Sequence, residues 1–305
     1  MNFSFDIYLE HFGFERRPFT LVPDPDFVFW SRTHKKASAV LQYGLIARAP
    51  ITLVTGEVGS GKTTLLRDLL KTITDDLVIG FISNSTATDR ADLMRLILTS
   101  LEQAYGEEEP YAALSRRFEE FLIEEYAKGR RVVLIFDEAQ NLGRDSLEQL
   151  RMLTNINFAE HELVQLVLVG QPELRDIIMQ SDMTQLAQRI SASVFLPRLG
   201  DADIENYINH RLRVAGAKNE IFLPETFSKI RQVTGGIPRL INQLCDFSLL
   251  YAFEADQQFV DGAIVQEVLD DQLFFCAGRA HPLRLVQGEQ SPPNLNDRLS
   301  GDDKK

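Results

Sequence analysis

Cysteine and histidine are scarce in this chain of 305 residues. Its two cysteines, Cys245 and Cys276, have no zinc-ligand spacing and form no disulfide framework, which favours a reducing compartment. The five histidines are scattered, and none lies at metal-ligand spacing from another. The sequence therefore gives no sign of a zinc site or of a fold held together by disulfides.

An excess of basic residues is also missing. The chain carries 32 Lys and Arg against 44 Asp and Glu, a net charge of −12. A protein whose main task is to hold nucleic acid non-specifically needs the opposite balance, because Lys and Arg neutralise phosphates. DNA is therefore an unexpected partner, although a small basic patch can exist on an acidic protein.

Long apolar runs are absent as well. None approaches the roughly 18 to 20 residues that a membrane helix needs. The N-terminus, MNFSFDIYLE, has acidic residues where a signal peptide carries positive charge. The longest apolar runs, 132–136 and 166–169, are short and rich in Val, Ile and Leu, as buried strands are. We expect no transmembrane segment and a cytoplasmic location.

What the chain does contain is an alternation of strand and helix patterns. Hydrophobic residues make up 44% of the sequence, enough for a sizeable core. Short apolar runs predict strands at 51–56, 77–82, 132–136, 163–169 and 193–197. Helical periodicity separates them, at 33–47, after residue 62, and at 90–104, 112–127, 146–155 and 172–190. This order predicts an α/β fold with a parallel sheet flanked by helices.

From Asp201 onward the pattern is purely helical, which predicts a small all-helical domain. Its helices are expected at 201–215, 224–233, 238–255 and 261–272. We divide the chain into four parts: an aromatic and proline-rich strap (1–31) lying on the core, a nucleotide-binding α/β domain (32–199), a helical lid (200–275) and a disordered polar tail (276–305).

A phosphate-binding loop lies between the first strand and the next helix. It matches G-x-x-x-x-G-K-[ST] and, with one further residue, comprises Gly56, Glu57, Val58, Gly59, Ser60, Gly61, Lys62, Thr63 and Thr64. Glycines allow backbone N–H groups to curl around a phosphate, which also meets the positive end of the helix. Lys62 can reach the β- and γ-phosphates, and the Thr63 hydroxyl can ligate Mg²⁺. A plain glycine turn is the alternative, which the strand and helix around the motif disfavour.

Two carboxylates, Asp137 and Glu138, follow the apolar strand 132–136. In phosphate-loop ATPases the aspartate at this place holds magnesium, usually through water. A neighbouring glutamate can accept a proton from the attacking water. We therefore predict Asp137 as a metal residue and Glu138 as the general base, which favours hydrolysis over phosphotransfer. The alternative is two charges that merely cap a strand as it reaches the surface.

The chain resembles the AAA+ ATPases, and within them the ExeA/GspA-like group of general secretion, exosortase and exopolysaccharide loci. The resemblance covers about residues 10–272. It rests on the segments FGFERRPFTLVPDPDFVFWSRTHKKA, TGEVGSGKTTLL, LIFDEAQNL, VLVGQPELR, LAQRI and TGGIPRLIN, in this order. The resemblance implies a P-loop NTPase of the AAA+ type whose helical domain acts as a lid.

The resemblance also implies roles for three further residues. Gln171 occupies the sensor-1 place, where a polar side chain contacts the γ-phosphate or the water; an ordinary Gln-Pro turn is the alternative. Arg239 matches the sensor-2 arginine of the lid, unless it is a surface residue beside a proline-initiated helix. Arg189 lies where an arginine finger reaches a neighbouring subunit, and a salt bridge within one subunit fits its position as well.

The aromatic strap (1–31), which we also call the leader, offers a place for adenine. Phe29, Trp30 and His34 precede the helix that leads to the phosphate-loop strand, and a base can stack on such residues. Aromatic clusters serve more often as core, so we favour core packing for these three.

These features predict a Mg²⁺-dependent ATPase that hydrolyses ATP to ADP and phosphate. The resemblance implies a homo-oligomer that drives or gates a secretion or polysaccharide-export complex through a protein partner. Longer members of the group continue into a membrane helix and a periplasmic domain, so direct action on the cell wall is not expected of this chain. The alternatives are a DNA-associated ATPase of the transposition type and a scaffold that binds ATP without turnover, against which Glu138 speaks.

Overall fold

A computed structural model describes residues 7–271, apart from residues 23, 72–73, 84–85, 107 and 159–160. The described residues lie in one compact unit, Met1–Phe274. The predicted polar tail 276–305, the end of the predicted lid and Cys276 lie outside the described residues. Within the described part of the chain, no helix combines the length and apolarity that a membrane crossing requires.

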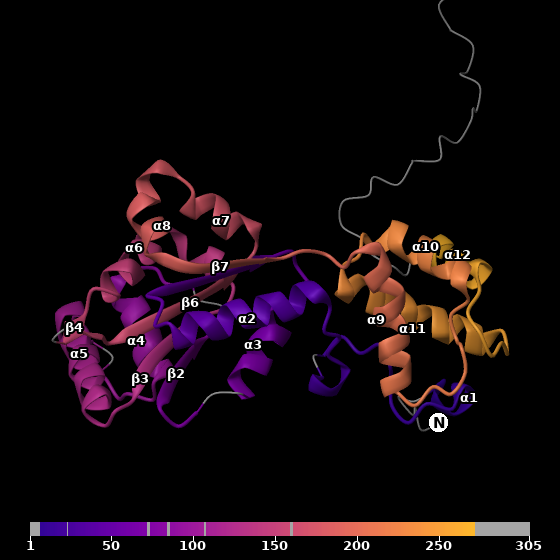
Figure 1. Cartoon of the computed structure of the whole chain (residues 1–305), viewed down its shortest axis with the longest axis horizontal. Coiled ribbons are helices and arrows are strands. Elements are labelled where there is room, and N and C mark those ends of the chain that lie inside the picture. Colours follow the sequence, from indigo (N-terminus) through magenta and orange to yellow (C-terminus); the bar gives the residue numbers. More distant parts are fainter. Residues whose placement is uncertain are drawn as a thin grey trace, which may run out of the picture. The chain divides into compact units, whose positions relative to one another are not determined.

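A five-stranded sheet forms the centre of the α/β region (Figure 1). In sequence its strands are β1 (Ile51–Gly56), β2 (Leu77–Ile82), β3 (Arg131–Phe136), β6 (Val164–Gly170) and β7 (Ile190–Leu196). They pair in the order β2-β3-β6-β1-β7, and every pairing is parallel. The predicted parallel sheet is confirmed, although the last strand begins at Ile190 rather than near residue 193. Because the strands are parallel, the segments that follow β1, β3 and β6 meet at one edge.

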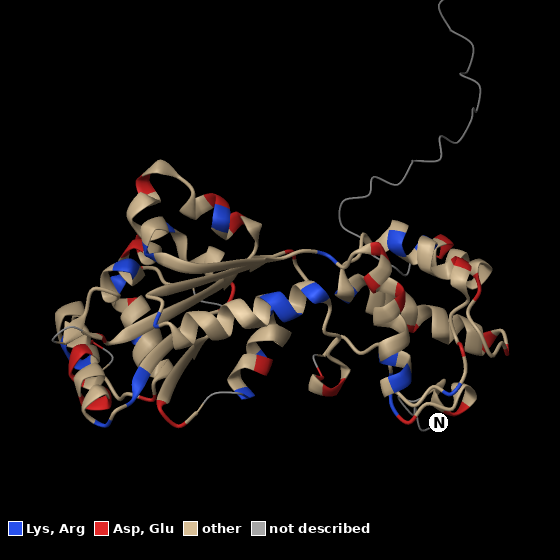
Figure 2. Cartoon of the chain, viewed as in Figure 1, with Lys and Arg blue, Asp and Glu red and all other residues tan. Residues whose placement is uncertain are grey.

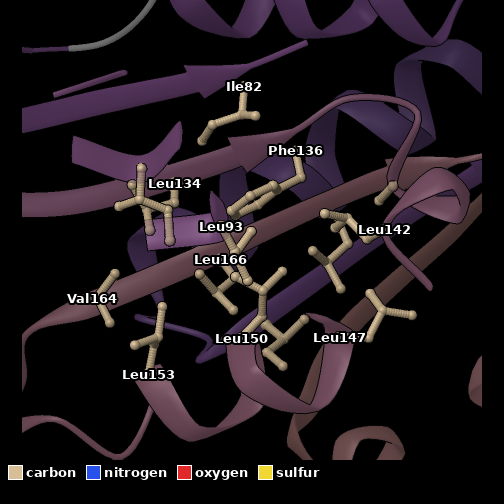
Figure 3. Close-up of a cluster of buried hydrophobic side chains, with 14 of the residues drawn as sticks. Ile82, Leu93, Leu134, Phe136, Leu142, Leu147, Leu150, Leu153, Val164 and Leu166 are labelled. Atoms are coloured by element: carbon tan, nitrogen blue, oxygen red, sulfur yellow. The ribbon is translucent and has the colours of Figure 1, made fainter. Parts of the chain in front are cut away.

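Helices cover both faces of the sheet. They are α2 (Arg32–Ile46), α3 (Lys62–Lys71), α4 (Arg90–Ser100), α5 (Tyr111–Ala127), α6 (Gly143–Leu153), α7 (Pro172–Ile178) and α8 (Thr184–Arg189). Side chains alternate across each strand, so one strand supplies both faces. Leu134, Phe136 and Leu166 point into a cluster with Leu93 and Leu150 from the helices of one face (Figure 3). The opposite face is a second apolar cluster, to which α2, α3 and the alternate strand residues contribute.

A two-stranded antiparallel hairpin between α6 and β6 was not predicted. It consists of β4 (Asn157–Phe158) and β5 (His161–Glu162). Two-residue strands carry no alternating pattern, so the sequence offered no signal for them. The Tyr126 ring of α5 lies beside the rings of Phe158 and His161, at 5.7 and 5.8 Å between centroids. This contact ties the hairpin to α5.

Four longer helices make up the region after the sheet. They are α9 (Asp201–Val214), α10 (Pro224–Thr234), α11 (Pro238–Glu254) and α12 (Gly262–Asp270), within two residues of their predicted bounds. Pro224 and Pro238 open their helices, where the missing N–H of proline costs nothing. Gly235, with φ of 58°, ends α10 in the left-handed conformation that glycine tolerates.

The described part of the leader packs mainly on this helical region. It contains a short helix α1 (Leu9–Phe12) and a 3₁₀ turn η1 (Pro25–Phe27). Its buried aromatic rings, Tyr8, Phe12, Phe14, Phe19 and Phe27, belong to the same apolar cluster as the inner faces of α9 to α12. The described part of the strap therefore completes a core whose other residues come nearly 200 positions later in the sequence.

Candidate functional site

The phosphate loop connects β1 to α3 and depends on its glycines. Gly59 and Gly61 have φ angles of 75° and 98°, which side chains with a Cβ rarely adopt. A Cβ on Gly56 would lie 2.7 Å from the carbonyl oxygen of Leu196 on β7. Both observations fit a backbone shaped to surround an anion, as the motif predicts.

Lys62 is buried at the start of α3. Its Nζ donates hydrogen bonds to the carbonyl oxygens of Gly56 (2.8 Å) and Glu57 (3.0 Å). Burial lowers the pKa of Lys62, and the nearby carboxylates, Glu138 foremost, counteract part of that effect. The loop thus holds a lysine whose ammonium group can exchange two carbonyl contacts for phosphate oxygens.

Thr63 and Asp137 meet across the site. The Thr63 hydroxyl donates to Oδ2 of Asp137 at 3.3 Å, although 74 positions separate the two residues. Burial raises the pKa of Asp137, helped by the charge of Glu138, while the backbone N–H of Glu138 counteracts this rise. Mg²⁺ binds oxygen ligands and usually takes only one or two of them from the protein. A hydroxyl and a buried carboxylate supply such oxygens. These two residues therefore fit the metal predicted for them.

Glu138 is held by two amide side chains. Its Oε2 accepts hydrogen bonds from Nε2 of Gln171 (2.9 Å) and from Nε2 of Gln140 (2.6 Å). Burial would raise the pKa of Glu138, but these two bonds and the charge of Lys62 lower it overall. The backbone of Glu138 has a φ of 55°, an uncommon conformation for a residue with a Cβ. The glutamate is thus fixed in orientation and kept ionised.

Gln140 is a residue that sequence reasoning missed. It lies in the 3₁₀ turn η2 (Ala139–Leu142), and its Oε1 accepts from the backbone N–H of Gln171 at 3.1 Å. The side chain therefore links the end of β3 to the end of β6. The available signal was a glutamine two residues after the candidate general base. A short turn can bring the side chain of such a residue back toward the glutamate.

Arg239 lies against the phosphate loop. A Cβ on Gly59 would lie 2.8 Å from the Cβ of Arg239, so backbone and side chain are in close approach. The loop and the first turn of α11 line one cavity of about 370 Å³. Two larger hollows, of about 670 and 700 Å³, contain no phosphate-loop residue, so volume alone does not identify the site.

Three further residues line this cavity and had not been predicted: Tyr207, Arg211 and Asn242. Tyr207 donates to Oδ1 of Asn242 at 2.7 Å, and Arg211 donates from Nε to the carbonyl oxygen of Pro18 at 2.6 Å. The leader residues 20–22 also line the cavity. In the sequence, the only signal for this part of the cavity was the presence of polar residues on the inner side of α9 and α11.

Arg189 makes its contacts within the chain. Its guanidinium lies 3.4 Å from Oε1 of Glu162 on the hairpin and also donates to the side chain of Asn155. Arg189 is not among the described residues that line the cavity. The structure thus contains the intramolecular salt bridge that the sequence left open.

The three candidates for an adenine pocket do not all lie together. The Phe29 ring packs edge-on against Tyr207, at 5.8 Å between centroids. Trp30 packs against the apolar cluster of α2 and α3. His34 is buried and bonds to the phosphate loop, with Nε2 3.0 Å from the carbonyl oxygen of Ser60. Phe29 and His34 line a small cavity of about 80 Å³, which shares Tyr207 and Arg211 with the larger one.

Solved structures of other proteins share this fold. Cdc6p from Pyrobaculum aerophilum has a TM-score of 0.65 and 16% identity, covering 84% of this chain and 73% of its own. The ORC2 protein of Aeropyrum pernix has a TM-score of 0.63 and 16% identity, covering 85% of this chain and 72% of its own. The family model for the AAA domain matches residues 46–178. The fold is therefore of the AAA+ P-loop class.

A curated relative narrows the class. General secretion pathway protein A from Aeromonas hydrophila is 40% identical to this chain over 247 residues, which are 81% of the chain and 45% of the relative. The chain belongs to the AAA+ ATPases of the ExeA/GspA family. It spans less than half the length of the curated relative that it matches.

Proposed function

We propose that the chain binds ATP with Mg²⁺ at this site and hydrolyses it to ADP and phosphate. The observation that supports this most is the meeting of three sequence-distant groups at one sheet edge: Lys62 after β1, Asp137 and Glu138 after β3, and Gln171 after β6. A binding scaffold would need the first of these groups but not an oriented glutamate.

In this proposal the phosphate loop binds the β- and γ-phosphates through its backbone N–H groups and Lys62. Thr63 and Asp137 would hold Mg²⁺, which when bound supplies positive charge against the phosphate oxygens. We assign the adenine and the ribose to the remainder of the cavity, which is lined by Tyr207, Arg211 and the leader.

Glu138 is the general base. Both amides donate to Oε2, so we assign Oε1 to the attacking water. The water oxygen attacks the γ-phosphorus, its proton passes to Glu138, and the bond to the bridging oxygen of ADP breaks. Gln171 orients Glu138 in this scheme, in place of the direct γ-phosphate contact expected of sensor 1.

Arg239 is the residue that would stabilise phosphate charge from α11, since it adjoins the loop. Arg189 would act in a homo-oligomer, as a finger in a neighbouring subunit's site, once freed from Glu162. A mixture of Arg189→Ala with Lys62→Ala protein tests this role. Recovered hydrolysis in the mixture supports a finger in trans, and co-assembly without recovery opposes it.

The biological role that we propose is to drive or regulate a secretion or polysaccharide-export complex from the cytoplasm, through a protein partner. The relative's name, general secretion pathway protein A, supports this role, and its longer chain makes the role a proposal for the present one. Phosphate release from ATP by the purified chain, with Mg²⁺ and with EDTA, tests the activity itself. Absence of Mg²⁺-dependent release would refute it.

A DNA-associated ATPase is the second candidate. Structures of similar fold include Drosophila ORC bound to DNA, with a TM-score of 0.63 and 14% identity, covering 89% of this chain and 67% of that one. Basic residues also gather at the beginning of α2 (Figure 2), where Arg32, Lys35 and Lys36 are exposed. Binding to duplex DNA with ATP at two salt concentrations discriminates the candidates. Tight, salt-sensitive binding would favour this one.

A further inference from the structure

His34 makes a buried contact with the phosphate loop that the chemistry of ATP hydrolysis does not use. It lies in the first turn of α2, three residues after the N-cap residue Ser31. Its Nε2 lies 3.0 Å from the carbonyl oxygen of Ser60, and its Nδ1 lies 2.7 Å from Oγ of Ser31. His34 and Ser31 are 9% and 2% exposed, so water does not compete for these bonds.

The partners determine which nitrogen of the ring carries the proton. The carbonyl oxygen of Ser60 has no proton to give, so Nε2–H of His34 is the donor. In a neutral ring Nδ1 is then an acceptor, and the Ser31 hydroxyl donates to it. The Ser31 oxygen in turn accepts from the backbone N–H of His34. Burial lowers the pKa of His34, with the Ser60 carbonyl counteracting it, which agrees with a neutral ring.

The bond to Ser60 has a consequence for the next residue. In a trans peptide the C=O and the N–H point to opposite sides of a rigid plane. With the Ser60 oxygen held by His34, the N–H of Gly61 points away from the ring. Gly61 has a φ of 98°, and a Cβ there would lie 3.1 Å from Nε2 of His34. The ring therefore occupies the space that the glycine leaves open.

The leader holds Ser31, and with it His34, in place. Phe29, two residues before Ser31, packs on Tyr207 of α9, and Arg211 of the same helix donates to the backbone of Pro18. The segment that positions Ser31 is thus fastened to the helical region. Through His34, the Ser60–Gly61 peptide is connected to that region as well as to its own strand and helix.

We propose that His34 is a positioning residue for the phosphate loop. Its Nε2–H holds the Ser60–Gly61 peptide in the orientation that points the Gly61 N–H toward the phosphate site. This orientation is already present before nucleotide binds. This inference rests on the proposed ATP site, and it assigns to His34 a role in binding rather than in the stacking of adenine. Preorganised amides bind an anion more tightly because no backbone rearrangement accompanies binding.

Two substitutions, His34→Gln and His34→Asn, distinguish the effect of the Nε2–H donor from the effect of the size of the ring. The amide nitrogen of a glutamine lies near the place of Nε2, whereas that of an asparagine reaches only the place of Nδ1. The affinity for the ATP analogue AMP-PNP with Mg²⁺ is measured by calorimetry, and the melting temperature is measured without nucleotide. We expect His34→Gln to bind within about threefold of the wild type and His34→Asn about tenfold more weakly. KM for ATP should rise more than kcat falls, since the amide contacts phosphate throughout.

Val40→Ala is the matched control. Val40 lies on the same helix, packs against the α2–α3 cluster and is not among the described residues that line the cavity at the phosphate loop. It should lower the melting temperature and leave AMP-PNP affinity unchanged. A second variant, Ser31→Ala, removes the partner of Nδ1 and should weaken binding about threefold. Its control is Asp261→Ala, which removes the N-cap of α12.

The outcomes are distinct. Equal affinities for His34→Gln and His34→Asn would overturn the inference while leaving the ATP site intact. An equal loss in Val40→Ala would do the same, because it would show that any weakening of α2 lowers affinity. A wild-type chain that binds no AMP-PNP would instead overturn the proposed function, and the inference with it. Should His34→Asn fail to fold, the comparison of Ser31→Ala with Asp261→Ala decides.

Discussion

The α/β region and the helical region differ in where they carry the candidate functional groups. In the α/β region both faces of the sheet are packed with aliphatic side chains, and the reactive groups Lys62, Asp137 and Glu138 gather at one edge. The helical region instead carries a polar network, Tyr207 with Asn242, inside its core. In the function that we propose, the chemistry of phosphate is local to the sheet edge, while the helical region fastens the leader and lines the rest of the cavity.

The sharpest test of this division is Lys62→Ala. It removes the ammonium group that the loop carbonyls hold, so ATP hydrolysis should fall at least about 1,000-fold. The melting temperature without nucleotide should change little, since burial of the ammonium group costs free energy that its two hydrogen bonds to the loop offset. Phosphate release and calorimetric unfolding measure the two effects. The exposed Lys71 of the same helix provides the control, Lys71→Ala. Unaltered turnover in Lys62→Ala would remove the loop from the mechanism.

Glu138→Gln tests the base without changing shape. The amide cannot accept a proton from water, so kcat should fall by about 100-fold or more while ATP stays bound. Single-turnover measurement of bound ATP and ADP distinguishes the steps. Wild-type hydrolysis in this variant would show that another group activates the water.

Arg239→Ala asks whether the helical region takes part in the chemistry at all. The Cβ and Cδ of Arg239 lie beside Gly59 of the phosphate loop, so the loss of this side chain should lower kcat/KM about tenfold. Steady-state hydrolysis provides the measurement, with Arg213→Ala, an exposed arginine of α9, as the control. If both variants behave alike, the helical region would shape the cavity without contributing charge to it.

Gln171→Ala should move the pH dependence of hydrolysis. The amide stabilises the ionised form of Glu138, so removing it raises the pKa of this carboxyl toward or above its ordinary value. A base must be ionised, so the acid side of the profile of kcat against pH should shift to higher pH. Gln188→Ala, at an exposed position on α8, should leave the profile in place. A fall in kcat at every pH without a shift would contradict the assigned role.

The smallest effect is expected from Tyr8→Phe, which tests the attachment of the leader. The Tyr8 hydroxyl donates to Asp246 of α11, and Arg17 of the leader lies 2.5 Å from the same carboxylate. Losing one bond while the ion pair remains should lower the free energy of unfolding by about 1 kcal/mol, measured in urea. Tyr43→Phe changes the exposed Tyr43 of α2 and should cost nothing measurable. A marked loss of ATP affinity in Tyr8→Phe would show that the leader controls the site directly.

Much of the fold follows from the sequence because its signals are local. Apolar runs such as 132–136 predicted the strands, and the prolines at 224 and 238 marked the starts of two helices. The hairpin at 157–162 escaped prediction because strands of two residues leave no periodic pattern. The early start of β7 at Ile190 was also missed, although its burial alternates along the strand.

For the site, the division between sequence and structure is physical. The motif Gly56–Thr63 and the pair Asp137 and Glu138 are readable in the sequence, because a phosphate loop and a strand end are built by neighbours along the chain. The tertiary structure decided the rest. It brought Gln140 and Gln171 to Glu138, Arg239 to Gly59, and His34 to Ser60, and it paired Arg189 with Glu162. Contacts between distant segments depend on how the strands are ordered and how the helices pack, and no local pattern of residues encodes either.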